Sequence, residues 1–119
     1  MTIASRYLLI VSMDVEPEYE ALFNEVYDQE HVPYLMQVEG VHSVSRAKGE
    51  SFDFAMGGAI KNVAAPVPAY IAMYEIDDPA VVASDAWAEA VETGRWATEV
   101  RPHTTNRHHA MYKVRASDA

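Results

Sequence analysis

A histidine in the first half of the chain continues a row of aromatic residues. Phe23, Tyr27 and His31 are spaced four residues apart, and residues at this spacing lie on one face of a helix. Phe23 and Tyr27 belong to a predicted buried stripe, so we expect His31 to point inward or to the rim of the core. An imidazole there titrates near neutral pH and can transfer protons or hydrogen-bond a substrate oxygen. The alternative is a structural histidine that binds backbone carbonyls at a helix end.

The helix that carries this row is predicted to run from Pro17 to about Val38. Proline suits the first turn of a helix, where its missing N–H costs nothing. Pro33 should kink or break the helix near His31–Val32, and Gly40 should end it. A break at this point would free backbone carbonyls and open a gap beside the histidine.

The other histidines give no pattern typical of a metal site. His108 and His109 are adjacent on a predicted strand, so they must point to opposite faces and at most one can share a site with His31. No helical or loop pair among the five histidines has the spacing of metal ligands. A haem would need a large apolar cavity, for which 119 residues leave little room. We therefore expect neither a metal nor another cofactor.

Four strands and two helices are expected to position these residues. The predicted strands are Tyr7–Val15, Val41–Lys48, Ala69–Ile76 and Asn106–Val114. A second helix should start at Asp77-Asp78-Pro79 and run to about Thr93, with Arg95 to Thr105 as a connection. The order β-α-β-β-α-β predicts an α+β, ferredoxin-like fold: an antiparallel sheet with both helices on one face. The length fits a single domain over residues 1–119.

The first and third predicted strands are apolar on both of their faces. In Tyr7–Val15, for example, both the odd and the even positions are largely apolar, whereas a strand with one wet face should alternate. Two helices can cover only one face of the sheet. A second copy of the sheet is the simplest cover for the other face, so we expect a face-to-face homodimer.

The segment from Glu50 to Pro68 is harder to assign. Gly57-Gly58 and two prolines argue against regular structure, yet the segment contains several large apolar residues. A long ordered loop in a compact domain is often a lid or a binding loop. A strand extension and turn whose apolar residues cap the core fits equally well.

The composition excludes several classes of partner. The chain has 18 acidic and 9 basic residues and a formal charge of −9, which disfavours nucleic acid and anionic membrane surfaces as partners. The longest apolar run, Tyr7 to Val11, is too short to cross a bilayer. The chain has no cysteine, which removes disulfides and thiolate chemistry and fits a cytoplasmic location.

Several motifs resemble the dimeric α/β-barrel superfamily, above all its EthD-like and REDY/HapK-like members. The first is the run Phe-Asn-x-x-Tyr-x-x-Glu-His-x-Pro from Phe23 to Pro33. The others are Val38-Glu39-Gly40-Val41, Ser45-Arg46, Tyr70–Ile76 and Arg101-Pro102-His103. The resemblance covers nearly the whole chain, although relatives often carry Trp where this chain has Val26.

This resemblance implies a barrel built from two sheets across the dimer, with a ligand cavity between the sheet and the helices of each subunit. Members of the superfamily include cofactor-free quinone-forming monooxygenases, muconolactone isomerases and haem enzymes. By the resemblance, His31 would line the cavity as a general acid/base, with Tyr27 or Tyr74 as a hydrogen-bond donor. Substrate-binding candidates are Asn24, Glu30, Arg46 and His108.

Each of these candidates also has a plainer interpretation. Asn24 and Glu30 could be solvated helix residues, although Glu30 could instead hold the tautomer of His31. Arg46 could bind an anionic ligand or pair with a surface carboxylate, and Tyr74 could face the cavity or pack in the dimer barrel.

Two functions are therefore expected from the sequence. One is a cofactor-independent isomerase, lyase or monooxygenase that acts on a small aromatic, lactone or polyketide-like compound. The other is a non-catalytic dimeric protein that binds small molecules or is associated with stress.

Overall fold

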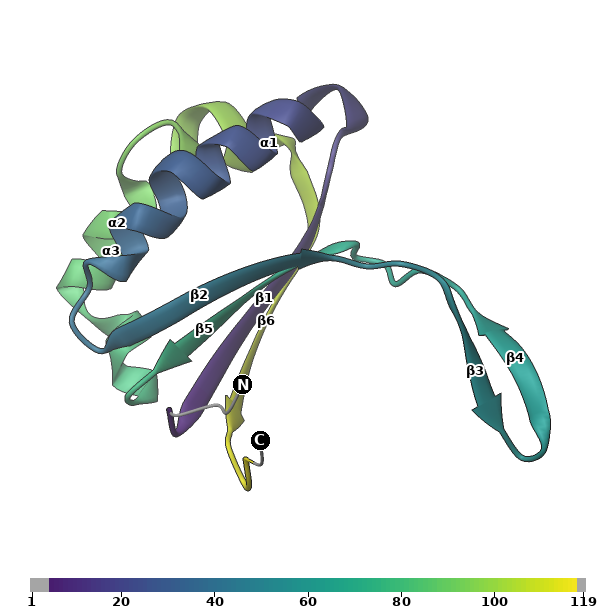
Figure 1. Cartoon of the computed structure of the whole chain (residues 1–119). Helices are drawn as coiled ribbons and strands as arrows, with labels where there is room; N and C mark the ends of the chain where they lie inside the picture. Colours follow the sequence, from purple (N-terminus) through teal and green to yellow (C-terminus); the bar gives the residue numbers. More distant parts are fainter. Residues whose placement is uncertain (1–4, 118–119) are drawn as a thin grey trace.

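The computed structural model describes residues 5–117, which form a four-stranded antiparallel sheet with helices on one face (Figure 1). The strands of this sheet are β1 (Tyr7–Val15), β2 (Val41–Lys48), β5 (Tyr70–Ile76) and β6 (Thr104–Lys113), in the order β2-β5-β1-β6. All three pairings are antiparallel. The predicted ferredoxin-like arrangement, with an antiparallel sheet and helices over one face, is confirmed.

The first helical region is continuous but changes its winding. It consists of η1 (Pro17–Tyr19), α1 (Glu20–Val26), the π-helical turn η2 (Tyr27–His31) and α2 (Val32–Met36). The amide of Val32 donates to the carbonyl of Tyr27, five residues back instead of four. This wider turn accommodates Pro33, which has no N–H to donate and whose ring would clash with an α-helical carbonyl. Pro33 was predicted to kink or break the helix near His31–Val32. The helix does not break there, but its α-helical winding is interrupted by the π turn Tyr27–His31.

The second helical region is divided into short pieces. These are η3 (Pro79–Ala83), α3 (Asp85–Glu92), the π-helical turn η4 (Trp96–Val100) and η5 (Arg101–His103). The Ser84 side chain accepts from the amide of Trp87 and starts α3, so the single helix expected up to Thr93 is interrupted. The predicted connection after Arg95 is helical. In it, the amide of Arg101 bonds five residues back, just before Pro102, as in η2.

The hydrophobic core lies between the sheet and the helices. Leu9, Val11 and Met13 of β1 point into it and are buried. The opposite face of the sheet carries further apolar residues, with Ile10 opposite Met73, beside polar ones such as Ser12 and Glu75, and no element of residues 5–117 covers it (Figure 1). The uncovered face agrees with the apolar pattern of the strands, and the dimer stays a prediction.

A β-hairpin extends away from the end of the sheet, and we call residues 52–63 the arm (Figure 1). Its strands are β3 (Phe52–Met56) and β4 (Ala59–Val63), joined by Gly57 and Gly58 at φ 63° and 78°. Two successive positive φ values favour glycine, which permits the tight turn. The radius of gyration is 16.0 Å, compared with about 13.5 Å expected for a compact chain of this length.

The arm differs from both interpretations of this segment. It is a regular β-hairpin instead of a loop. None of its residues lines the cavity described below, so it is not a lid over the cavity of its own subunit. The expected turn is present, but the apolar side chains do not cap the core. Phe52, Met56 and Ile60 are 52%, 58% and 69% exposed.

Candidate active site

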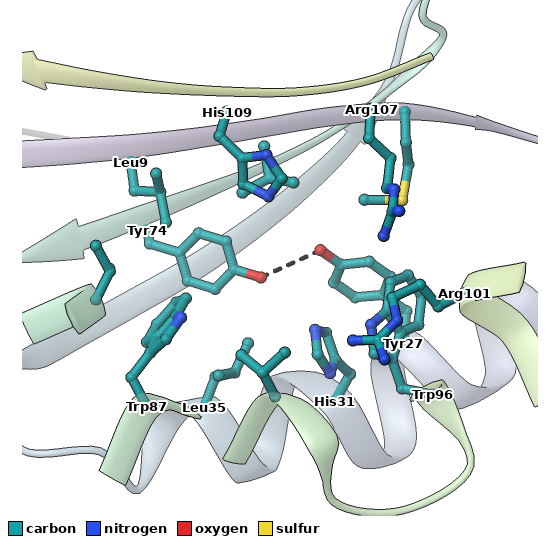
Figure 2. Close-up of a pocket in the computed structure, with 14 residues that line it drawn as sticks. Leu9, Tyr27, His31, Leu35, Tyr74, Trp87, Trp96, Arg101, Arg107 and His109 are labelled. Atoms are coloured by element: carbon teal, nitrogen blue, oxygen red, sulfur yellow. Dashed lines mark hydrogen bonds between the residues drawn. The ribbon is translucent and has the colours of Figure 1, made fainter. Parts of the chain in front are cut away.

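A cavity of about 300 Å³ lies between the sheet and the helices, at the lower end of the usual size of small-molecule pockets. Figure 2 shows its side chains converging from β1, β5 and β6 on one side and from the helices on the other. The aliphatic part of the wall consists of Leu9, Val11, Met13, Leu35, Val82 and Val91. The remaining lining residues are aromatic or basic, so a bound compound would meet few but specific polar groups.

Two phenols form the polar centre of this cavity. The hydroxyl oxygens of Tyr27 and Tyr74 lie 3.1 Å apart, and both side chains are buried (Figure 2). Burial raises the pKa of Tyr27 and raises the pKa of Tyr74 well above its ordinary value. Both phenols are therefore neutral at pH 7. Because one hydroxyl proton satisfies their mutual hydrogen bond, the other is available to a ligand oxygen.

His31 lies beside the phenol pair as the last residue of η2. Its ring stacks on the indole of Trp96 at 4.5 Å and meets the edge of Tyr27 at 5.0 Å, and the residue is only 4% exposed. Burial, followed by the charge of Arg101, lowers the pKa of His31 from 6.5 to about 4. The imidazole is therefore neutral at pH 7 and can accept a proton.

The Nδ1 atom of His31 is buried and has no hydrogen-bond partner within residues 5–117. The structure thus shows no capping of helix carbonyls by this ring, which was the structural alternative. An unsatisfied buried polar atom costs about 1–3 kcal/mol, and such atoms call for an explanation such as a bound ligand or water. The two π turns bring this ring to Trp96, and π turns are frequent at functional sites.

Arg101 supplies the nearest fixed charge at this end of the cavity. Two of its nitrogens donate to the carboxylate of Glu92, at 2.5 and 2.9 Å. This bidentate pair holds the guanidinium in place, and it lowers the pKa of Glu92. Arg101 therefore contributes a positive field to the cavity while its hydrogen-bonding capacity is partly used.

Glu30 does not orient His31. Its carboxylate accepts hydrogen bonds from the Arg95 amide at 3.0 Å and from the Arg95 guanidinium at 2.5 Å. These bonds lower the pKa of Glu30. The interpretation that Glu30 holds the tautomer of His31 is wrong, because the carboxylate connects η2 to the start of η4.

Asn24 and Arg46 lie behind the cavity wall and do not line it. Arg46 donates to the carboxylate of Asp28 at 2.5 Å and to the amide oxygen of Asn24 at 2.9 Å. Its guanidinium carbon is 4.4 Å from the ring centroid of Tyr27. Of the two interpretations of Arg46, the structure shows pairing with a carboxylate, and the pair supports the outer side of the Tyr27 ring.

The register of β6 decides which of the adjacent histidines meets the cavity. His109 lies opposite Val11 and lines the cavity, whereas His108 lies opposite Ser12 on the other face of the sheet. The structure therefore places His109, and not the predicted His108, at the cavity. Burial lowers the pKa of His109.

Sequence reasoning missed several lining residues: Trp87, Trp96, Arg101, Arg107 and His109. Trp87 and Val91 are four residues apart on α3, a spacing that could have placed both on the inner face. Arg101 was noted only as part of a motif. No comparable signal marked Trp96, because the segment around it was expected to be an irregular connection.

Within residues 5–117, no three His, Asp or Glu side chains are grouped so that they could bind a metal ion together. In the same range, no helix has the length and apolar character needed to span a membrane.

Comparisons with known proteins give matches in structure only. No protein-family model matches the chain, and no curated protein matches it. One similar structure is a mutant of SnoaB, a cofactor-independent oxygenase from Streptomyces nogalater, with a TM-score of 0.56 and 13% identity over 92% of this chain and 93% of that one. Another is an ethyl tert-butyl ether D (EthD) family protein from Bacillus halodurans, with a TM-score of 0.55 and 12% identity over 91% and 98%. The chain therefore has the ferredoxin-like fold of these proteins, and the resemblance to the dimeric α/β-barrel superfamily with its EthD-like members is confirmed at the level of the fold.

Proposed function

We propose that this chain is a cofactor-independent enzyme of the isomerase, lyase or monooxygenase type. Its substrate would be a small aromatic, lactone or polyketide-like compound bound in the cavity between sheet and helices. One observation carries the proposal: a buried, neutral His31 with an unpartnered Nδ1 lies in a cavity beside two phenol hydroxyls. The fold of SnoaB, a cofactor-independent oxygenase, supports the same reaction class.

In this proposal, His31 acts as a general base on an acidic C–H or O–H group of the substrate. With a pKa of about 4 in the empty cavity, it accepts a proton readily only when the anion formed beside it stabilises the imidazolium. The free hydroxyl of the Tyr27–Tyr74 pair would donate to the oxygen on which negative charge develops. The imidazolium can then return its proton to the same or a different atom.

A non-catalytic binding protein is the second candidate function. The observation that favours it is the absence, among the described residues, of a hydrogen-bonding group that fixes the tautomer of His31. Catalytic histidines are commonly held by such a group. In this case the cavity would retain a small organic molecule without turnover.

Exchange of substrate protons with solvent deuterium distinguishes the two functions. Hydroxylated naphthalenes, lactones and polyketide mimics are screened for binding, and deuterium uptake into each bound compound is followed by NMR. We expect His31→Ala to slow uptake by roughly 10²–10⁴-fold, with little change in melting temperature. His108→Ala is the matched control, since this neighbouring histidine faces away from the cavity.

The outcomes separate three cases. Binding to the wild type without deuterium uptake would support the binding protein. A sharp fall in melting temperature for His31→Ala, with binding and uptake intact, would make His31 structural. Equal effects of His31→Ala and His108→Ala would remove the case for a site at His31.

We further propose that the protein works as a homodimer whose sheets face each other. The uncovered apolar face of the sheet supports this, and so does the arm. Phe52, Phe54 and Met56 alternate along β3 and share one face, with Val63 opposite Phe52. An isolated two-stranded hairpin is marginally stable in water, so the apolar face of the arm favours contact with the second copy. A cytoplasmic location remains a prediction from the sequence.

A further inference from the structure

The charge of the cavity differs from the charge of the chain. The protein has twice as many acidic as basic residues, yet no Asp or Glu from residues 5–117 lines the cavity, while Arg101 and Arg107 do. Arg101 is bound to Glu92. For Arg107, the described part of the chain offers no ion pair and no hydrogen bond to its side chain. A solvent-exposed guanidinium without an ion pair thus lies at the wall of a largely apolar space.

A β-bulge in β6 lies directly beside Arg107. Along the pairing of β1 with β6, Ser12 lies opposite His108 but Asp14 lies opposite Thr105, so two residues of β6 face the one residue between them. Arg107 and His109 are two residues apart, so the alternation of β6 places both on the cavity side, as Figure 2 shows. The extra residue interrupts this alternation before Arg107, so that Thr105 lies opposite Asp14 and does not continue the row of Arg107 and His109. Bulges often re-aim a side chain beside a functional site.

The bulge is itself built by specific contacts. Asn106 has a φ of 55°, in the left-handed region that few residues other than glycine adopt and that asparagine tolerates. Its side-chain amide donates to one carboxylate oxygen of Asp14 at 2.8 Å, and the other oxygen of Asp14 accepts from the amide of Ala69 at 2.7 Å. The backbone next to Arg107 is therefore fixed by contacts with Asp14 of β1.

We propose that Arg107 recognises a carboxylate on the ligand, so that the cavity takes a small, flat, monoanionic aromatic compound. A guanidinium matches a carboxylate with two parallel hydrogen bonds. The field of a chain with a charge of −9 repels anions at long range, so selection of an acidic ligand needs a local cation of this kind. The aromatic part would lie among the apolar residues and reach the phenol pair. This inference rests on the proposed function, because it places the ligand in the same cavity.

Binding of two probes of equal shape tests the inference. These are 2-naphthoate, which carries a carboxylate, and 2-naphthamide, its neutral counterpart, and both are titrated while the fluorescence of Trp87 and Trp96 is recorded. We expect the wild type to bind naphthoate more tightly. Arg107→Gln should weaken naphthoate binding by roughly 10-fold to 100-fold, the loss of a charged hydrogen bond, and leave naphthamide binding within about twofold.

Two further variants control for charge and for folding. Arg115→Gln removes the same charge from an exposed position outside the cavity, so it should leave both affinities nearly unchanged at 150 mM salt. Arg107→Lys keeps the charge without the planar fork and should restore part of the naphthoate affinity. Circular dichroism confirms that each variant is folded.

Several results would overturn the inference. These are equal affinity of the wild type for the two probes, an equal loss of both affinities in Arg107→Gln, or the same effect from Arg115→Gln. Binding of neither probe at millimolar concentration would overturn both this inference and the proposed cavity function. Discrimination that depends on Arg107, without deuterium uptake in any ligand, would overturn only the proposed catalysis.

Discussion

The buried His31 should make the protein lose stability as the pH falls from 7 towards 4. Its pKa is about 4 in the folded chain, compared with an ordinary value of 6.5. Between these two values the unfolded chain binds more protons than the folded chain, so the free energy of unfolding decreases as protons are added. The stability contributed by the neutral ring is complete above pH 6.5 and is lost below pH 4.

The size of the effect follows from the difference between the two pKa values. From pH 8 to pH 5, this one ring should reduce the free energy of unfolding by about 2 kcal/mol, and by about 3 kcal/mol once the pH is below 4. That is a large fraction of the stability of a small domain, which is typically about 5–15 kcal/mol.

Urea denaturation of the wild type and of His31→Gln at pH 8, 6.5 and 5 measures the effect. Glutamine is polar but does not titrate, so the variant should lose about 2 kcal/mol less than the wild type between pH 8 and pH 5. Protein concentration is held constant, because a dimer dissociates as it unfolds. Contributions from other groups, including His109, occur in both proteins and cancel in the difference.

One result would refute the reasoning directly. If the two proteins lost the same stability over this pH range, the imidazole of His31 would titrate at an ordinary pKa and its surroundings would not be dry. An NMR titration of the His31 ring with a midpoint near 6.5 would lead to the same conclusion. The proposed role of a neutral base in an apolar cavity would then lose its physical foundation.

Three other predictions concern assembly, backbone and site. Sedimentation should show a dimer at micromolar concentration, and Ile71→Glu, on the uncovered sheet face, should dissociate it. The backbone amides of Phe52–Val63 should then exchange hydrogen faster. A stable wild-type monomer would contradict the proposal. Gly94→Ala should lower the free energy of unfolding in urea more than Gly57→Ala. Both glycines have positive φ, but a Cβ at position 94 would come within 2.7 Å of a glutamate oxygen, whereas one at position 57 would meet nothing within 4 Å. Tyr74→Phe should cost about 1 kcal/mol of stability, because it leaves the buried phenol of Tyr27 unpaired. It should also slow deuterium uptake without abolishing ligand binding. Unchanged uptake would exclude the phenol pair from the chemistry.

The sequence predicted the sheet and the inner position of His31 because both depend on regular periodicity. The strand Tyr7–Val15 is marked by apolar residues on both of its faces, and the four-residue spacing up to His31 follows the helix face. Tyr27, His31 and Tyr74 do meet in one cavity. These features require only local repeats and the known order of the elements.

The rest of the site depends on departures from regular periodicity, which a single sequence does not mark. His109 lies at the cavity instead of His108 because of the register between β1 and β6, which is set by long-range pairing. Glu30 and Arg46 were assigned to the ligand because their partners, Arg95 and Asp28, could be identified only in three dimensions. The arm was misjudged because Gly57-Gly58 was taken as a sign of irregular structure, although it is also typical of a hairpin turn.

Because of the two π turns, the site depends on the number of residues in its helices as well as on which residues they contain. Each holds one residue more than an α-helix would use, and in each case a proline stands two residues after the end of the turn. Deleting a single residue between Tyr27 and His31 would convert the wide turn into an ordinary α-helical turn, and the flanking helices could keep their faces. The residues within the turn, His31 among them, would then shift relative to the cavity although every side chain except one was retained. Insertions and deletions within these helices are therefore a route by which relatives with this fold can gain or lose such a site in one step, and alignments that forbid gaps inside helices will misplace its residues.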